Sequence, residues 1–141
     1  MQGVGNLQFP LLAGFIFMDE DMDTITIVLP PVNPKLNAHN KGHWRGKAAA
    51  VKSLRNLTHA LTLEQTRERW PAATIQYRFY FPDKRRRDEA NAIHSQKAAV
   101  DGVVDAGLIP DDDWQHLSIA GVTCEVDRDN PRVEFVFTKS Q

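Results

Sequence analysis

Alternating apolar and polar residues predict four β-strands along the chain. Residues 24–29 alternate and are rich in β-branched side chains, and two prolines end the run. Residues 74–81 show the clearest alternation, with four apolar side chains on one face. Two further strands are predicted at 117–126 and 132–137, and the turn around 129–131 between them is typical of a hairpin.

Helical spacing of apolar residues predicts two long helices between these strands. The first is expected over residues 47–69, closed off by Pro71. The second is expected over residues 91–106, and Gly107 is placed to cap its C-terminus. The first helix is expected to pack on the core through Val51, Leu54, Leu57 or Thr58, and Leu61, and the second through Ile93, Val100, Val103 and Val104.

The order β-α-β-α-β-β predicts the fold class α/β (α+β): a single domain with a mixed sheet of about four strands and two main helices. The apolar run 9–18 is preceded by no basic residue and followed by acidic residues, which disfavours a signal peptide. Met22 directly precedes the first strand. We interpret residues 1–21 as an extension that is either not native, an extra edge strand or an apolar arm, and residues 22–141 as the domain.

The composition is that of an ordinary globular chain: 141 residues, 42% hydrophobic and 25% charged. The single cysteine, Cys124, excludes an intramolecular disulfide and favours a reducing, cytoplasmic setting. Its place in the alternation of a strand predicts a core position. No apolar run reaches the roughly 20 residues of a membrane-spanning helix, so no membrane partner is expected.

Charge is unevenly distributed, although the net formal charge is only −1. Residues 24–63 contain six basic and no acidic residues, residues 84–87 are all basic, and residues 98–130 contain eight acidic residues and one basic residue. A protein that holds a polyanion and cuts it needs both regions, because cations neutralise phosphates and carboxylates bind a metal that activates water. Solvated surface, with oppositely charged faces attracting one another within the fold, explains the same pattern.

The polar face of the second predicted helix carries titratable side chains rather than a mixed solvating set. On a helical wheel at about 100° per residue, this face consists of Asn91, His94, Lys97, Asp101 and Asp105. The ordinary alternative is a surface ion pair between Lys97 and Asp101, one turn apart.

Carboxylates flank this helix on both sides. Asp88 and Glu89 stand at its entrance, and Asp111, Asp112 and Asp113 follow after a short loop. If that loop doubles back, carboxylates from both ends meet on one side of the sheet. Carboxylates and water suit Mg²⁺, and a lysine beside them can stabilise charge developing at a phosphodiester. The alternatives are an N-cap at the entrance and a solvated loop at the exit.

These residues resemble the RusA-like Holliday-junction resolvases, which are small, homodimeric, Mg²⁺-dependent endonucleases often found in phages and prophages. The resemblance covers residues 23–138 and rests on 25–31, Asn33, 85–88, Asn91, 97–99, Asp101, 106–107 and 111–112. It implies a bacterial or phage-encoded phosphodiester hydrolase that cleaves Holliday junctions or other branched DNA in recombination and repair. It further implies Mg²⁺ as cofactor, Mn²⁺ as a substitute, and no nucleotide cofactor.

Matched residue by residue, the resemblance covers four positions of the family pattern. Asp88 matches the first metal-binding aspartate of the family's Asp-x-Asp-Asn signature, and Asn91 matches its asparagine. Lys97 is similar to the essential lysine, and Asp112 or its neighbour Asp111 to the last catalytic aspartate.

Two departures from the family pattern affect the expected site. The second signature aspartate falls on Ala90, which cannot bind a metal. The gap from Asn91 to Lys97 is three residues longer than in the signature, and without it His94 would hold the lysine position. We expect Glu89, His94 or Asp101 to complete the site.

The resulting hypothesis assigns catalysis to Asp88, Lys97 and Asp112, and metal binding to Asp88, Asp112, Asp111, Glu89 and Asp101. DNA is expected to contact Lys41, Arg45, Lys47, Lys52, Lys84, Arg85, Arg86, Arg87, Asn91 and His94. A homodimer suits paired incisions across a junction. The alternatives are a catalytically weak or inactive junction-binding protein, motivated by Ala90, and a small RNA-binding module.

Aromatic and histidine residues receive lesser roles. Trp44, beside an arginine, is expected either to stack on an exposed base or to pack as a hydrophobic staple. Trp70 and Trp114 are interpreted as packing residues, with a subunit contact as the alternative. His39 and His43 favour phosphate contact or solvation over metal binding, because no third ligand matches them.

Overall fold

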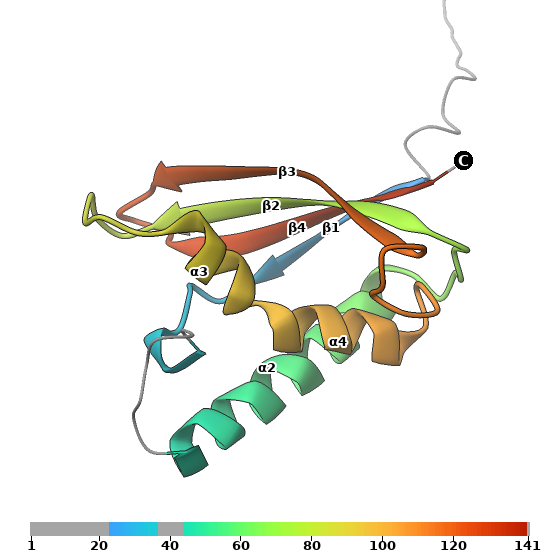
Figure 1. Ribbon diagram of the computed structural model, residues 1–141, viewed down its shortest axis with the longest axis horizontal. Coiled ribbons are helices and arrows are strands. Elements are labelled where there is room, and N and C mark those ends of the chain that lie inside the picture. The colour runs from blue at the N-terminus through green and yellow to red at the C-terminus, as the bar shows by residue number, and fades with distance from the viewer. Residues whose placement is uncertain (1–22, 37–43, 141) are drawn as a thin grey trace, which may run out of the picture.

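The protein is described by a computed structural model covering residues 23–36 and 44–140. Its elements are β1 (Thr24–Leu29), η1 (Pro34–Leu36), α2 (Trp44–Gln65), β2 (Ala73–Phe81), α3 (Glu89–His94), α4 (Lys97–Ala106), β3 (Leu117–Val126) and β4 (Arg132–Lys139). Figure 1 shows the helices gathered on one side of the sheet. The predicted extension over residues 1–21 lies outside the described ranges.

The four strands form one mixed sheet in the order β1-β4-β2-β3. β4 runs antiparallel to both β1 and β2, whereas β2 runs parallel to β3. Burial alternates along the whole of β2, as the sequence predicts for a strand with one face on the core. The predicted α+β class, with a mixed four-stranded sheet and two main helices in a single domain, is confirmed.

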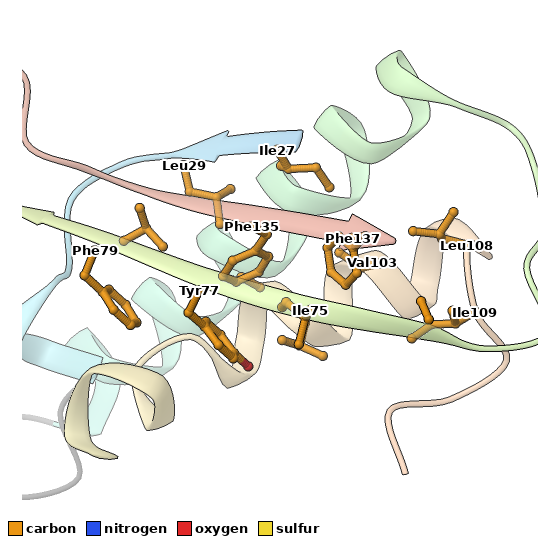
Figure 2. Packing of buried hydrophobic residues seen from close by; sticks show 14 of the residues in the cluster. Ile27, Leu29, Ile75, Tyr77, Phe79, Val103, Leu108, Ile109, Phe135 and Phe137 are labelled. Atoms are coloured by element: carbon orange, nitrogen blue, oxygen red, sulfur yellow. The ribbon is translucent and has the colours of Figure 1, made fainter. Parts of the chain in front are cut away.

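The core lies between the sheet and helices α2 and α4. Figure 2 shows its labelled side chains: Ile27 and Leu29 from β1, Ile75, Tyr77 and Phe79 from β2, Phe135 and Phe137 from β4, Val103 from α4, and Leu108 and Ile109 from the following loop. The rings of Tyr77 and Phe135 meet edge to face with centroids 5.3 Å apart, an arrangement that aromatic quadrupoles favour. The predicted core face of the second helix is confirmed, because Val100 and Val103 are buried.

The hairpin predicted between the last two strands is wrong. β2 lies between β3 and β4, so these consecutive strands do not pair. The chain leaves β3, passes the end of β2 where the Asp127 amide donates to the Phe81 carbonyl at 2.8 Å, and enters β4. Five connecting residues easily span the roughly 10 Å between strands two places apart. The strand with the fuller apolar face, β2, thereby takes the inner position.

α2 spans Trp44–Gln65 instead of the predicted 47–69. The chain leaves the helix before Pro71 because the residues after Gln65 turn to bury Trp70, which is 2% exposed. The Trp70 ring nitrogen donates to Glu68 Oε1 at 2.9 Å, and its amide donates to the Leu108 carbonyl at 2.6 Å. The packing role predicted for Trp70 is therefore confirmed.

The buried face of α2 is built on threonines. Thr58 and Thr62 are fully buried, and each hydroxyl donates to the backbone carbonyl one turn earlier at 2.7 Å. These bonds remove the cost of burying a hydroxyl group. Leu54 and Leu61 pack against the core as predicted, whereas the core position predicted for Val51 is wrong, because Val51 is 37% exposed. Of the two residues considered for the remaining position, Thr58 faces the core and Leu57 is 38% exposed.

The second predicted helix, over 91–106, is two helices. α3 ends at His94 and α4 begins at Lys97, and the two residues between them are buried. The Ser95 hydroxyl donates to the Ala92 carbonyl at 2.6 Å, and Gln96 Nε2 donates to that hydroxyl at 3.0 Å. The polar face predicted for one continuous helix is therefore interrupted at this break.

At the far end of α4, Asp105 pairs with Arg55 of α2. Arg55 Nε donates to one carboxylate oxygen at 2.6 Å and Nη2 donates to the other at 2.8 Å. This bidentate pair joins the basic helix α2 to the acidic helix α4. At this position the uneven charge of the sequence therefore serves to hold two parts of the fold together, which was the alternative to ligand binding. Asp105 is thus separated from the other titratable residues of the predicted face.

Asp105→Asn is expected to remove an acid-sensitive part of the stability. The hydrogen bond from Arg55 holds the pKa of Asp105 below its usual range. Such a carboxyl contributes stability above its unfolded pKa of about 3.9 and loses it as the pH falls through the lower folded pKa. The difference in Tm between wild type and variant should be constant above about pH 5 and shrink below about pH 3. A difference that persists unchanged in strong acid would contradict this origin.

In the ranges that the structure describes, no helix is both long and apolar enough to cross a membrane.

Candidate functional site

Lys97 is held between two carboxylates at the start of α4. Its ammonium donates to Asp101 Oδ1 at 2.9 Å and to Asp112 Oδ2 at 2.5 Å. Asp101 lies one helical turn along α4, whereas Asp112 is 15 residues away in the loop before β3. The loop after the helix therefore does double back toward the helix start, and it brings a distant carboxylate to the lysine.

Lys97 and Asp112 stabilise each other's ionised forms. The Asp112 hydrogen bond is the largest cause of a raised pKa at Lys97, followed by the Asp101 hydrogen bond. In return, the Lys97 hydrogen bond lowers the pKa of Asp112. At neutral pH the cluster therefore holds an ammonium and carboxylates, with a net negative charge available to a further cation.

The returning loop is fixed by its ends and by its own backbone. Gly107 caps α4 as predicted, with φ +90° and its amide donating to the Val104 carbonyl at 2.9 Å. The next two residues are 1% exposed and anchor the loop in the core. Asp111 Oδ1 accepts from the Asp112 amide at 2.8 Å. Asp113 instead accepts from the Gln115 amide at 3.0 Å and so turns away from the lysine.

The lysine cluster opens into a pocket of about 510 Å³ between α3, α4 and the starting half of β3. Its lining combines charged, aromatic and aliphatic side chains: Tyr77, Ile93, His94, Lys97, Val100, Asp112, Trp114, Leu117 and Ile119. Burial, together with the charge of Asp112, raises the pKa of Tyr77 to about 12. The Tyr77 phenol is therefore protonated at neutral pH and can donate a hydrogen bond in the pocket.

Sequence reasoning missed two residues of this pocket. Strand alternation puts Tyr77 on the apolar face of residues 74–81, and its hydroxyl group is the only signal in the sequence of a second role. Trp114 was interpreted as a packing residue, but 83% of it is exposed. Its position directly after three aspartates could have indicated a surface role.

The entrance carboxylates lie apart from the lysine cluster. Asp88 is the N-cap of α3, and its Oδ1 accepts from the Ala90 amide at 2.9 Å, which is the structural alternative considered for it. Glu89 lines a different hollow with Glu125 and Cys124, at the end of β3. The predicted convergence thus brings Lys97, Asp101 and Asp112 together, and places Asp88 and Glu89 elsewhere.

Cys124 is exposed on β3, so its predicted core position is wrong. β3 is an edge strand, and its last four residues are all exposed. Partial burial, followed by the charge of Glu89, raises the pKa of the Cys124 thiol. The thiol is therefore a poor nucleophile at neutral pH.

The basic loop between β2 and α3 divides into paired and unpaired cations. Arg85 and Arg87 both bind Asp83, at 2.9 Å and 2.8 Å, and the Arg85 hydrogen bond is the largest cause of a strongly lowered Asp83 pKa. Within the described chain, Lys84 and Arg86 make no ion pair or hydrogen bond. These two cations are the ones available to a ligand.

The remaining residues predicted to contact DNA lie in three places. Asn91 lines a hollow with Arg86 and Asp88, next to the basic loop. His94 is exposed in the pocket of the lysine cluster. On α2, Arg45 and Lys52 are exposed and Lys47 is half-buried. Lys41, His39 and His43 fall outside the described residues.

Trp44 is 70% exposed, and the Arg45 guanidinium lies 5.4 Å from its ring centroid. The exposure fits the stacking role proposed for Trp44 better than the staple role, because a staple residue is covered by the first turn of its helix.

The donor set at Lys97 suits a magnesium ion held by few protein groups. Asp101 and Asp112 both accept hydrogen bonds from the Lys97 ammonium, so their side chains converge on one point. Their oxygens are hard ligands of the kind that Mg²⁺ prefers. Over residues 23–36 and 44–140, no group of three His, Cys, Asp or Glu side chains is arranged to hold a metal ion. An ion here would be held by Asp101 and Asp112 with waters in the remaining positions, as Mg²⁺ allows, and it would share both carboxylates with the Lys97 ammonium.

Neither a protein-family model nor a curated protein matches this chain. The case for a function therefore rests on the residues and their geometry.

Proposed function

We propose that this chain is a RusA-like, Mg²⁺-dependent endodeoxyribonuclease that cleaves Holliday junctions or other branched DNA as a homodimer. The observation that carries the proposal is the Lys97 ammonium held between Asp101 and Asp112. An ammonium fixed beside carboxylates at the mouth of a pocket combines a group that stabilises phosphate charge with groups that bind a divalent cation.

Each group of the pocket has a task in phosphodiester hydrolysis. Asp112 and Asp101, with Asp111 beside them, would hold Mg²⁺, which when bound supplies a Lewis acid and an activated water. Lys97 stabilises negative charge that develops on the phosphoryl oxygens. The Tyr77 phenol can donate a hydrogen bond to a phosphate oxygen, since it stays protonated.

The surroundings of the pocket suit a nucleic acid. Trp114 is 83% exposed at its rim and offers a face on which an unstacked base can lie. Lys84 and Arg86 lie near the other end of β3 and can neutralise flanking phosphates. Branched DNA supplies both unstacked bases and closely spaced backbones.

The test is cleavage of an end-labelled synthetic four-way junction, with a linear duplex of the same sequence as control. We expect nicks in the junction with Mg²⁺ or Mn²⁺, none with EDTA, and little cleavage of the duplex. Equal cleavage of both DNAs would leave a nuclease without structure specificity. No cleavage and no preferential binding of the junction would overturn the proposal.

A second candidate function is junction binding without efficient cleavage. Two observations favour it: Ala90 stands where the signature has an aspartate, and Asp88 is occupied as a helix cap rather than joined to Asp112. Tight binding of the four-way junction, unchanged by Mg²⁺ and without nicks, would support this candidate.

Arg86→Ala and Lys84→Ala are each expected to weaken junction binding and to reduce its salt dependence. Neither side chain is engaged within the described chain, so each is free to neutralise one phosphate. The log–log slope of affinity against salt should fall by about 1 for each substitution. Binding measured by fluorescence anisotropy at several salt concentrations checks this.

Arg67→Ala is the matched control, because Arg67 is an exposed arginine in the connection after α2. It should leave the salt slope unchanged. Equal effects of Arg67→Ala and Arg86→Ala would indicate a loss of bulk positive charge instead of a loss of specific phosphate contacts.

A further inference from the structure

β3 is an open sheet edge. It is ten residues long and pairs with β2 on one side, and no other described strand pairs with its opposite side. Glu125 is the only charged residue in the strand. Edge strands of monomeric proteins are usually kept short or protected by lysine or proline, because a bare edge can pair with another strand. β3 contains neither lysine nor proline, and its protection consists of the charge of Glu125 and a bulge at Ala120, where the pairing with β2 shifts by one residue.

The helix-side face of this strand carries an apolar stripe that is exposed except at Val122, which is half-buried and packs against the core. Its members are Ile119, Val122, Cys124 and Val126, which lie opposite the β2 core residues Ile75, Tyr77, Phe79 and Phe81. The β2 residues are at most 8% exposed, whereas Ile119 is 56% exposed and Val126 is 41% exposed. Figure 1 shows β3 along the rim of the sheet, beyond α3 and α4. Trp114, just before β3, extends the apolar surface.

Charges at the two ends of β3 select the orientation of a partner strand. The loop of residues 111–113 precedes β3 and is acidic. Lys84 and Arg86 lie in the loop at the other end of β3, because β2 and β3 run parallel, and there they share the surface with Glu89 and Glu125. An antiparallel second β3 brings each acidic loop toward the unpaired cations of the other copy. It also keeps the two Glu125 side chains apart, whereas a parallel partner would place them side by side.

We propose that β3 is the dimer interface, and that the β3 strands of two copies pair antiparallel about a two-fold axis. Such a contact is isologous and closed, because each copy uses the same edge and no edge is left for further addition. The two sheets then form one sheet, and the apolar stripe of each copy continues into that of the other. Trp114 takes the subunit-contact role that the sequence left open for it.

This arrangement deepens the homodimer that forms part of the proposed function, on which it rests. The pocket at Lys97 lies along the first half of β3, and the hollow beside Arg85 and Glu89 lies along the second half. Antiparallel pairing places the pocket of one copy next to the basic loop of the other. Cations from the second copy would therefore flank each lysine cluster and help to hold a DNA backbone there.

The interface is tested by the mass of the full chain in solution without DNA or metal. Sedimentation or light scattering should give twice the 15.9 kDa of one chain at micromolar concentration. Ile119→Lys should raise the dissociation constant at least about tenfold, because both copies then place a lysine in the apolar stripe. Val126→Lys is a second variant on the same stripe, and circular dichroism shows whether each variant remains folded.

Val28→Lys is the matched control. Val28 is also a β-branched residue on an edge strand and is 54% exposed, close to the 56% of Ile119, but it lies on β1 at the opposite edge. It should leave the dimer intact. Hydrogen exchange shows where on the chain the interface lies. Amides of residues 117–126 should exchange more slowly as the protein concentration rises through the dissociation constant of the dimer.

Three results would overturn the proposal. A monomer at 100 μM would exclude the interface, and slow exchange along β3 in that monomer would show that another part of the chain covers the edge. A dimer that tolerates Ile119→Lys and Val126→Lys uses a different surface. Because these measurements need neither DNA nor Mg²⁺, a failed interface is distinguishable from a failed nuclease.

Discussion

Asp112→Asn is expected to lower the rate of Mg²⁺-dependent junction cleavage by at least about 100-fold. The carboxylate of Asp112 accepts from Lys97 at 2.5 Å and, of the two carboxylates bound to Lys97, is the one supplied from outside α4. An amide of the same shape keeps the loop backbone but cannot balance a divalent cation. The substitution also removes the negative charge that orients the Lys97 ammonium. The rate of phosphodiester cleavage should therefore fall, whereas binding of the junction should not.

The measurement is a single-turnover rate with saturating protein, together with the affinity for the junction in Ca²⁺ or EDTA. Affinity should be unchanged or slightly stronger, because the substitution removes a negative charge near the backbone. Loss of rate with retained affinity separates a role in the reaction from a role in binding.

Asp113→Asn is the control within the same acidic run. Asp113 contacts His116 Nδ1 at 2.6 Å and the Gln115 amide at 3.0 Å, and makes no contact with Lys97. Its rate should stay within about threefold of wild type. Equal losses in both variants would show that the shape of the loop, and not the Asp112 carboxylate, supports cleavage. Full activity of Asp112→Asn would remove this residue from the site.

Local pattern was sufficient to predict the strands and the core of the second helical region. The alternation in β2 reports directly which side chains face the core, and the structure buries every second residue there. Gly107 was predictable as a cap for a physical reason, because its positive φ of 90° is costly for residues with a side chain. Such features depend on neighbours within a few positions in the sequence.

The sheet order could not be predicted in the same way. A turn at 129–131 is compatible with a hairpin, but β2 enters between the two strands because its apolar face needs cover from the helices. Cys124 was misplaced for the same reason, since alternation gives the face of a strand but not whether a helix lies above it. The break at Ser95 and Gln96 depends on burial of two polar residues, which the helical wheel does not report.

The candidate site was predictable in part. The spacing and the resemblance paired Lys97 with the acidic loop, and the structure places Lys97 and Asp112 in contact. The same reasoning expected Asp88 to join them. Asp88 instead caps α3, because a carboxylate just before a helix finds free backbone amides at once, whereas reaching Asp112 would need a different angle between α3 and α4.

Gly102→Val is expected to destabilise the fold strongly, by about 3 kcal/mol. Gly102 lies where α4 crosses α2, and a Cβ at this position would be 2.4 Å from the Arg55 carbonyl oxygen and 3.0 Å from the His59 amide nitrogen. Both atoms belong to the backbone of α2, so no side chain can rotate away. The helices must separate, and the buried contacts around Thr58 would open with them.

Gly46→Ala is the matched control, since it also replaces a helical glycine. Among the described residues, a Cβ at Gly46 would meet only Lys35 Nζ, at 3.9 Å, so the change should be neutral or stabilise by up to about 1 kcal/mol. Urea unfolding should show a lower midpoint for Gly102→Val and an equal or higher midpoint for Gly46→Ala, with similar m-values.

If Gly102→Val matched wild type, α2 and α4 could not approach as closely as described. The loop carrying Asp112 follows α4, so a separated α4 also carries Lys97 away from its place in the site.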